Sequence, residues 1–398
     1  MSATSGATTA VATSAATTAV ATSATIQPRS PTTNAIALIG QGGFGCVYYR
    51  GFDSHGNLLS RKYITKITKR EKTREIFIGN FVSKLPGYEA FFATVISVED
   101  INLGVIGAPT LSGCDIITRY SKSGPGTAGN DRTDDNSGTT RTPAVQFQIL
   151  KELYVPNTSM LGLVETVVGN VAKLLNTLIS CHGHVLVGIK RLQDECGIVH
   201  YDIKPQNVIF NTLIKNPIII DFGLSFFIRD VHAALAMPDT EAVVALKQFF
   251  YGYFPDYDAW PMEVHIISYI VKTTIHTTAS ETGDVRPVAI LTADALRAMV
   301  DEFMSRHNFI MYQTHAYKNR YRVRAIGHFT RIAVGRPGMT VIRNLVADWK
   351  MWDRYAVAEL FLDILQVMRK TYGEATLSPI ASQFDVFSTS LQRDANFI

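Results

Sequence analysis

The residues best suited to chemistry lie in one short segment, Ile198 to Ile209. It places a carboxylate (Asp202), an ammonium group (Lys204) and a carboxamide (Asn207) at fixed short spacing between apolar runs. Phosphoryl transfer demands little covalent chemistry from a protein and depends on positioning and charge neutralisation. Asp202 could lie beside an attacking hydroxyl, and Lys204 could follow the moving phosphate from the same side of the loop. The spacing therefore predicts phosphoryl transfer.

A second acidic position follows at Asp221-Phe222-Gly223, directly after an apolar run that reads as a strand. Metal ions that bridge phosphates prefer hard oxygen ligands, which Asn207 and Asp221 can supply. An ordinary turn rich in Asp and Asn is the alternative explanation. Because Lys204, Pro205 and Asn207 stand in register with Asp202, we prefer the catalytic interpretation.

A glycine-rich segment upstream has the pattern G-x-G-x-x-G-x-V and follows an apolar strand. Glycines let the backbone approach phosphate oxygens and adopt positive φ without steric cost. A dinucleotide-binding turn, the main rival, requires a helix directly after the last glycine, whereas Cys46 to Tyr49 reads as a second strand. We expect a strand-loop-strand hairpin that contacts nucleotide phosphates through Gly40, Gly42, Gly43, Gly45 and Val47.

These segments resemble those of protein kinases, which place a lysine that binds nucleotide phosphates on the third strand. Tyr63 to Ile67 has the best strand composition, which favours Lys66. Lys62 remains open, because strand alternation puts both lysines on the same face. The acidic partner is expected on the helix that follows. Glu75 is preferred because it adjoins apolar residues that would dock this helix, while Glu71 could equally be a solvated acid in the first turn.

Together these segments resemble the glycine-rich loop, the catalytic loop (H-R-D-x-K-x-x-N) and the D-F-G motif of eukaryotic-type protein kinases. The resemblance covers about 35–385, and Lys204 is similar to the serine/threonine branch. It implies ATP, two Mg²⁺ ions and transfer of the γ-phosphate to protein hydroxyls. It assigns Asp202 to the substrate hydroxyl, Lys66 to the α- and β-phosphates, and Asn207 and Asp221 to the metals. The general appearance is similar to divergent kinases of large DNA viruses.

The resemblance also implies the fold class and the domains. The fold expected is α+β and two-lobed, with a small antiparallel β-rich N-lobe that carries one helix and a larger helical C-lobe. We predict a disordered low-complexity tail at 1–34, the N-lobe at 35–154 with a flexible loop at 121–143, the C-lobe at 155–385, and a C-terminal tail at 386–398.

Local patterns refine this outline. Asp115 to Tyr120 and Val145 to Leu150 both read as strands, and Lys151 to Pro156 is expected to be the hinge between the lobes. Apolar residues from Leu161 to about Leu192 recur near helical spacing, which predicts one or two helices. About 264–345 is expected to be an insertion relative to a typical kinase.

Tyr201 and Asp353 stand at two further positions of the family motifs. The arginine of H-R-D is replaced by Tyr201, which removes the usual receptor for a phosphorylated activation loop, so we expect activity without that phosphorylation. Trp352 to Leu360 resembles the start of the kinase D-x-W helix, where Asp353 would brace the catalytic-loop backbone; a helix N-cap is the alternative. No A-P-E motif is present, and the possible replacements are Phe254 to Asp256 and Trp260 to Glu263.

Composition narrows the partners and the compartment. The net charge of +4 is too small to indicate nucleic-acid binding by itself. The sequence contains no uncharged apolar stretch of about 18 residues, so no membrane-spanning helix is expected. Widely spaced cysteines predict free buried thiols and an intracellular, reducing compartment; they are Cys46, Cys114, Cys181 and Cys196. The expected partners are protein substrates. The competing functions are a pseudokinase that only binds and a kinase-fold enzyme acting on a small molecule.

Overall fold

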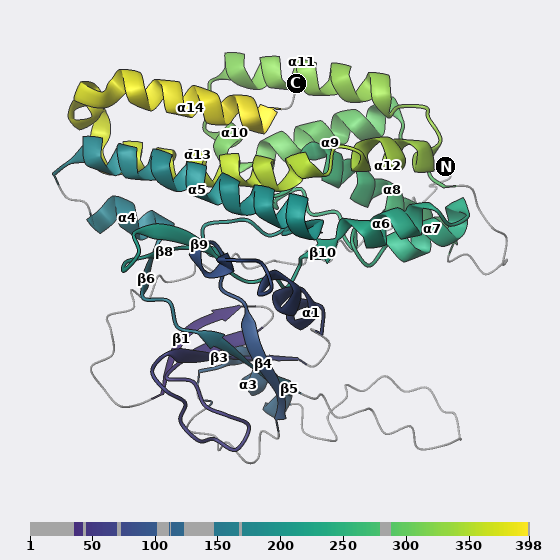
Figure 1. Cartoon of the computed structure of the whole chain (residues 1–398). Helices are drawn as coiled ribbons and strands as arrows, with labels where there is room; N and C mark the ends of the chain where they lie inside the picture. The colour runs from purple at the N-terminus through teal and green to yellow at the C-terminus, as the bar shows by residue number, and fades with distance from the viewer. Residues whose placement is uncertain are drawn as a thin grey trace, which may run out of the picture.

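The computed structural model describes residues 36–42, 45–69, 73–101, 111, 113–122, 147–166, 169–278 and 288–396. Within these residues the chain is α+β. Figure 1 shows a β-sheet on the N-terminal side, in the lower part of the view, with helices stacked above it. The expected tail at 1–34 lies outside the described residues, as does nearly all of the loop expected at 121–143.

The five-stranded sheet is antiparallel, in the order β1-β2-β3-β5-β4. β3 lies at its centre and buries four consecutive residues, Thr65 to Thr68. The strands of this sheet are β1 (Ala37–Gly42), β2 (Gly45–Tyr49), β3 (Tyr63–Lys69), β4 (Val95–Ile101) and β5 (Phe147–Leu153). Helix α1 (Thr73–Val82) follows β3 and lies between the sheet and the helices in Figure 1.

The strand prediction for Asp115 to Tyr120 is wrong, because this segment begins helix α3 (Asp115–Lys122). Ile116 and Ile117 are both buried in the core beside the sheet. Adjacent residues of a strand point to opposite faces, whereas a helix can direct both toward the same core. The strand predicted at Val145 to Leu150 is present from Phe147 onward, as β5.

The prediction of free thiols is wrong for two of the four cysteines. Cys46 of β2 and Cys114, just before α3, form a disulfide across a sequence separation of 68 residues. That separation carries no local signal, so only the packing of α3 on β2 brings the sulfurs together. Cys181 and Cys196 are free and buried, as expected.

The helical region forms the larger core. Its helices are α4 (Met160–Thr166), α5 (Val171–Cys196), α6 (Ile228–Leu235), α7 (Asp239–Leu246), α8 (Met262–Thr278), α9 (Ala293–Arg306), α10 (Asn308–Met311), α11 (His315–Ile332), α12 (Gly338–Val346), α13 (Lys350–Leu377) and α14 (Ala381–Asn396). The periodicity from Leu161 to Leu192 thus corresponds to two helices, α4 and α5. Asn170 caps α5 by accepting a hydrogen bond from the Lys173 backbone N–H.

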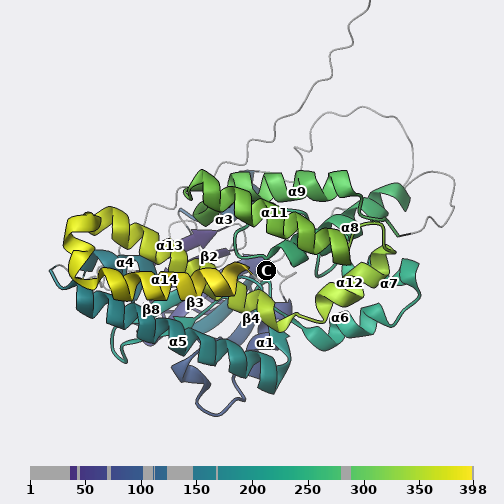
Figure 2. The ribbon, with the colours of Figure 1, turned by 90° about the horizontal axis from the view of Figure 1, so that it is seen from above.

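α13 is the central helix of this region. It packs on both α5 and α14, and Figure 2 shows α14 lying along it. A kink at Gly373, with φ of 71°, interrupts it. Phe387 and Leu391 of α14 are buried against the core. The expected tail at 386–398 therefore belongs to a packed helix as far as Asn396, because its apolar residues recur at helical spacing.

The segment expected to be an insertion, 264–345, is helical wherever it is described. It contributes most of α8, all of α9 to α11 and nearly all of α12. Its buried residues, such as Phe303 and Leu345, join the same core as α5 and α13. No helix within the described residues is both long and apolar enough to span a membrane.

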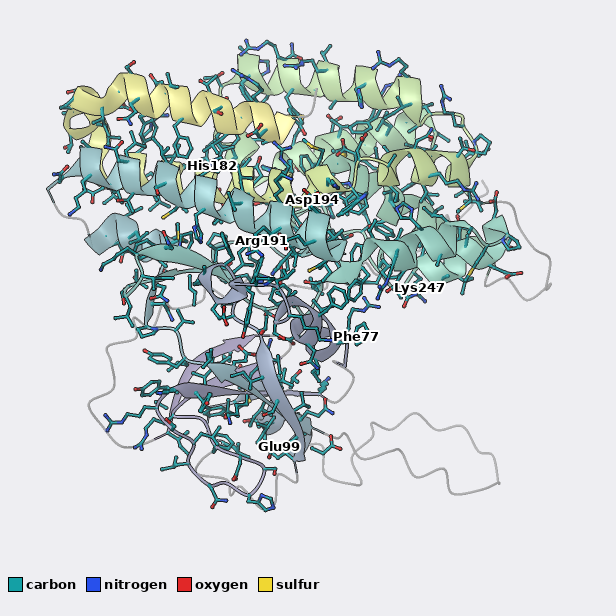
Figure 3. The ribbon with its side chains drawn as sticks, viewed as in Figure 1. Phe77, Glu99, His182, Arg191, Asp194 and Lys247 are labelled. Atoms are coloured by element: carbon teal, nitrogen blue, oxygen red, sulfur yellow. A yellow bond between two sulfur atoms is a disulfide. The ribbon has the colours of Figure 1, made fainter. Side chains whose placement is uncertain are left out.

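Contacts of α5 hold the sheet region against the helices. Arg191, labelled in Figure 3, donates to the carbonyl of Pro86 at 3.0 Å. The His184 ring stacks on Phe91 with centroids 4.5 Å apart, and its Nε2 lies 2.8 Å from the Ala90 carbonyl. These contacts attach the chain between α1 and β4 to the helical region, close to the site described next.

Candidate active site

The loop that carries Asp202 is anchored at its backbone. β7 (Ile198–Val199) is fully buried and pairs with β10 (Phe226–Phe227). Beyond it, the backbone N–H groups of His200 and Tyr201 each donate to the Asp353 carboxylate at 2.8 Å. Asp353 lies in the first turn of α13 and is almost fully buried. It braces the loop as expected and is not the N-cap, which is Trp349.

His200 is part of this anchor. Its ring is fully buried, and burial lowers its pKa to about 4, so it is neutral near pH 7. The Asp202 backbone N–H donates to Nδ1 at 3.3 Å, and Nε2 lies 3.2 Å from the Ile220 carbonyl. With Nδ1 as acceptor, Nε2 carries the proton. The neutral ring thus joins the Asp202 loop to the strand before Asp221.

Hydrogen bonds surround the Asp202 carboxylate. Lys204 Nζ lies 2.8 Å from Oδ1 and 3.1 Å from Oδ2, and Asn207 Nδ2 donates to Oδ2 at 2.7 Å. Asn207 Nδ2 also donates to the Asp202 carbonyl at 2.9 Å. Burial raises the Asp202 pKa to about 6, and Lys204 partly opposes that shift. The carboxylate is therefore ionised near pH 7 and close to the range of a general base.

A second cluster brings together residues from distant parts of the chain. Lys66 Nζ on β3 lies 2.7 Å from Glu75 Oε1 on α1 and 3.0 Å from Asp221 Oδ1. Burial alone would lower the Lys66 pKa, but Glu75 and Asp221 outweigh it and raise that pKa far above its usual value. Burial would raise the Asp221 pKa, but the Lys66 charge holds it low. Lys62 is exposed, so Lys66 is the lysine paired with Glu75.

The two clusters are adjacent through the backbone. The Ile220 N–H donates to the Asn207 carbonyl at 2.9 Å, which places Asp221 next to the Asp202 loop. Asp221 and Tyr201 both have positive φ, 63° and 69°. Such strained conformations persist only where surrounding structure enforces them, and they concentrate at functional sites. Gly223 lies close to Asp221: an added Cβ would be 3.1 Å from Oδ1.

The glycine-rich segment forms the predicted hairpin. Gly40 and Gly42 lie on β1, and Gly45 begins β2. A Cβ on Gly45 would lie 2.5 Å from the Ile67 carbonyl oxygen, so strand packing alone requires glycine there. Val47 is the register partner of Lys66, so the two residues lie on the same face of the sheet, beside the second cluster. Gly43 lies outside the described residues.

Two residues of the site were not foreseen from the sequence. Tyr257 lies in the loop before α8, and its hydroxyl donates to Asp202 Oδ1. Glu152, on β5 opposite Ile64, faces the second cluster; burial raises its pKa to about 7 while Lys66 opposes that shift. Glu152 could have been found by alternation, since its register partner Ile64 shares a face with Lys66. Tyr257 had no such signal.

The metal ligands inferred from sequence, Asn207 and Asp221, offer the oxygen type that Mg²⁺ prefers. Asn207 uses its amide nitrogen on Asp202, which leaves its side-chain oxygen as the remaining ligand group, and Asp221 supplies a low-pKa carboxylate. The described residues contain no group of three or more His, Cys, Asp and Glu able to hold a metal. Mg²⁺ commonly binds through one or two carboxylates completed by substrate phosphates. The pair therefore suits a metal that arrives with a nucleotide.

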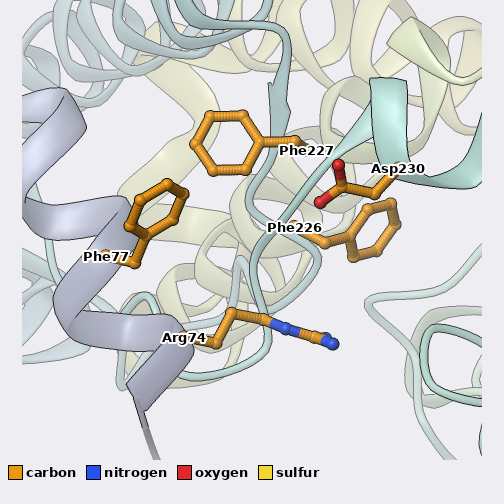
Figure 4. A pocket seen from close by; sticks show the side chains of 5 residues that line it. All are labelled: Arg74, Phe77, Phe226, Phe227 and Asp230. Atoms are coloured by element: carbon orange, nitrogen blue, oxygen red, sulfur yellow. The ribbon is translucent and has the colours of Figure 1, made fainter.

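A separate pocket of about 370 Å³ lies between α1 and the segment from β10 to α6. Figure 4 shows Arg74 and Phe77 on this helix facing Phe226, Phe227 and Asp230. The Phe77 and Phe227 rings are 5.7 Å apart, edge to face. The pocket does not include Lys66, Asp202 or Asp221, so it is distinct from the candidate active site.

Comparison of the chain with protein-family models gave no match, and comparison with curated proteins gave none either.

Proposed function

We propose that this chain is a two-lobed protein kinase that transfers the γ-phosphate of ATP to serine or threonine hydroxyls of proteins. The observation that carries the proposal is the meeting of Lys66, Glu75 and Asp221 beside the Asp202 loop. Lys66 and Asp221 are 155 residues apart in sequence yet 3.0 Å apart in space. A cation flanked by two acids, next to a third acid that Lys204 and Asn207 hold in place, suits phosphate binding and hydroxyl activation together.

In the proposed reaction, the acceptor hydroxyl donates its hydrogen bond to Asp202 and its oxygen attacks the γ-phosphorus. The new oxygen–phosphorus bond forms as the bond from phosphorus to the β,γ-bridging oxygen breaks; the proton passes to Asp202 and ADP leaves. Lys204 stabilises charge on the transferring group, and Lys66 binds the α- and β-phosphates. Asn207 and Asp221 would hold Mg²⁺, which neutralises phosphate charge when bound.

The decisive experiment measures transfer of radiolabelled phosphate from Mg-ATP to dephosphorylated casein. Asp202→Asn and Asp221→Asn should each lower the rate by about 10²–10⁴-fold, the usual contribution of a positioned base or charge. Asp294→Asn is the matched control, because its side chain is 94% exposed on α9. Binding of Mg-ATP without transfer by the wild type would instead indicate a pseudokinase. Transfer that is equal in all the variants would reject this site.

We also propose that activity does not require phosphorylation of the segment after Asp221. At the position of the usual arginine, Tyr201 is buried and its ring lies 4.7 Å from that of Trp260. A buried, uncharged tyrosine supplies no cation to pair with a phosphate. Ser225 is fully buried and donates to the His200 carbonyl, which also argues against its modification.

This proposal predicts that phosphate transfer survives alanine substitution of Thr240, Tyr251 and Tyr253 together, with turnover within about threefold of the wild type. Phosphatase treatment of the wild-type protein should likewise leave the rate unchanged. A loss of tenfold or more from either treatment would contradict it.

A further inference from the structure

Tyr257 places a hydroxyl of this same chain on the carboxylate of Asp202. Its hydroxyl donates to Oδ1, and Lys204 Nζ lies 5.6 Å from the centre of its ring. The ring packs edge to face on Trp260, with centroids 4.8 Å apart. The Trp260 indole in turn donates to the Tyr201 carbonyl at 2.9 Å, which fixes the loop beside the site.

This contact fills the remaining acceptor position of Asp202. A carboxylate offers about four lone-pair positions. Lys204 lies within hydrogen-bonding distance of both oxygens, Asn207 donates to Oδ2, and Tyr257 donates to Oδ1. A substrate hydroxyl needs one of these positions. The carboxylate therefore cannot receive it until one donor leaves.

Tyr257 is the donor most readily replaced. Lys204 and Asn207 belong to the loop that Asp353 braces, whereas Tyr257 comes from a separate segment of the chain. A phenol and an aliphatic hydroxyl present the same kind of donor to a carboxylate, so one can exchange for the other without loss of a hydrogen bond. Rotation of the Tyr257 side chain would suffice, since the backbone of its loop is held by hydrogen bonds from Tyr257 to Phe254 and from Trp260 to Tyr257.

We propose that the Tyr257 hydroxyl occupies the acceptor-hydroxyl site of Asp202 and that a protein substrate must displace it. The inference rests on the proposed kinase function and adds an internal competitor to it. Its consequence is that removal of the hydroxyl strengthens acceptor binding and leaves nucleotide binding unchanged. If Tyr257 only positioned Asp202, the same change would slow the chemical step.

Tyr257→Phe tests the inference because it keeps the ring on Trp260 and removes only the hydroxyl. With dephosphorylated casein at saturating Mg-ATP, we expect KM for casein to fall about three- to tenfold, the net effect of one hydrogen bond. We expect kcat and the KM for ATP to stay within twofold. Tyr253→Phe is the control: Tyr253 lies in the same loop, but its hydroxyl donates to Glu302 at 3.3 Å. An unchanged KM for casein, or a lower kcat at unchanged KM, would overturn the inference.

A binding measurement separates failure of this inference from failure of the proposed function. Fluorescence anisotropy of labelled casein can be followed with each variant in the presence of Mg²⁺ and a non-hydrolysable ATP analogue. Tighter casein binding by Tyr257→Phe with no transfer by any variant would keep Tyr257 as the competitor and reject catalysis. Transfer by the wild type, with equal casein affinity for wild type and Tyr257→Phe, would reject the competitor and keep the kinase.

Discussion

The two charge clusters of the site are assembled in opposite ways. Asp202, Lys204 and Asn207 lie within six consecutive residues, and their loop is fixed from outside by Asp353. Lys66 and Glu75 come from the sheet region, and they meet Asp221 only because the sheet region docks on the helices. The first cluster is a property of one loop, whereas the second depends on how two parts of the molecule are placed.

This difference predicts where each cluster is vulnerable. The local cluster keeps its geometry as long as its backbone is braced. The long-range cluster holds a buried acid, Glu75, and a partly buried one, Asp221, near one cation, so its energy depends on that single charge. Buried ion pairs are costly to break, because removal of one partner leaves a buried charge uncompensated. The largest effect is therefore expected at Lys66.

Lys66→Met should lower the free energy of unfolding by about 3–5 kcal/mol, because the Glu75 and Asp221 carboxylates lose the cation between them. Urea denaturation followed by circular dichroism measures this loss. Lys62→Met is the matched control, because Lys62 directly precedes the same strand and is exposed. Its substitution should change stability by less than about 0.5 kcal/mol.

The double variant Lys66→Met/Glu75→Gln sharpens the comparison. It removes one of the two acids and should recover part of the lost stability, because fewer like charges remain together. Equal and small effects of Lys66→Met and Lys62→Met would show that the second cluster does not carry this energy.

The same contrast explains what the sequence could predict. Asp202, Lys204 and Asn207 were identified from spacing alone, since their neighbours in sequence are also their neighbours in space. Strand composition favoured Lys66 but could not exclude Lys62, because alternation treats both alike. Only the docking of α1 decides that Glu75 faces Lys66. The brace by Asp353 was expected from a motif and is present, although 153 residues separate Asp353 from His200.

Several of the features that were missed depend on packing between distant segments. The Cys46–Cys114 disulfide requires α3 to lie against β2, while α3 itself was read as a strand. Tyr257 reaches Asp202 from 55 residues away through a loop with no regular periodicity. Such contacts leave no pattern in a single sequence, so motif spacing predicted the cluster and not what covers it.

A smaller effect is expected where the local cluster is braced. Asp353→Asn keeps the shape but replaces one carboxylate oxygen with an amide that cannot accept the second backbone N–H. One buried N–H, of His200 or Tyr201, then lacks its partner, which should cost about 1–3 kcal/mol at pH 7. Asp348→Asn, at an exposed position just before α13, is the control and should have no measurable effect.

The pH dependence identifies the source of this cost. Burial raises the Asp353 pKa from 3.8 to about 6, while the hydrogen bonds from Tyr201 and His200 oppose the shift. Between about pH 4 and pH 6 the folded protein thus binds more protons at this position than the unfolded chain, so this group's contribution to stability falls as pH rises. Asparagine does not titrate, so the stability difference between wild type and Asp353→Asn should be larger at pH 5 than at pH 7. A difference that grows with pH would mean that ionised Asp353 is the better brace. Denaturation at the two pH values, with Asp348→Asn in parallel, decides between these outcomes.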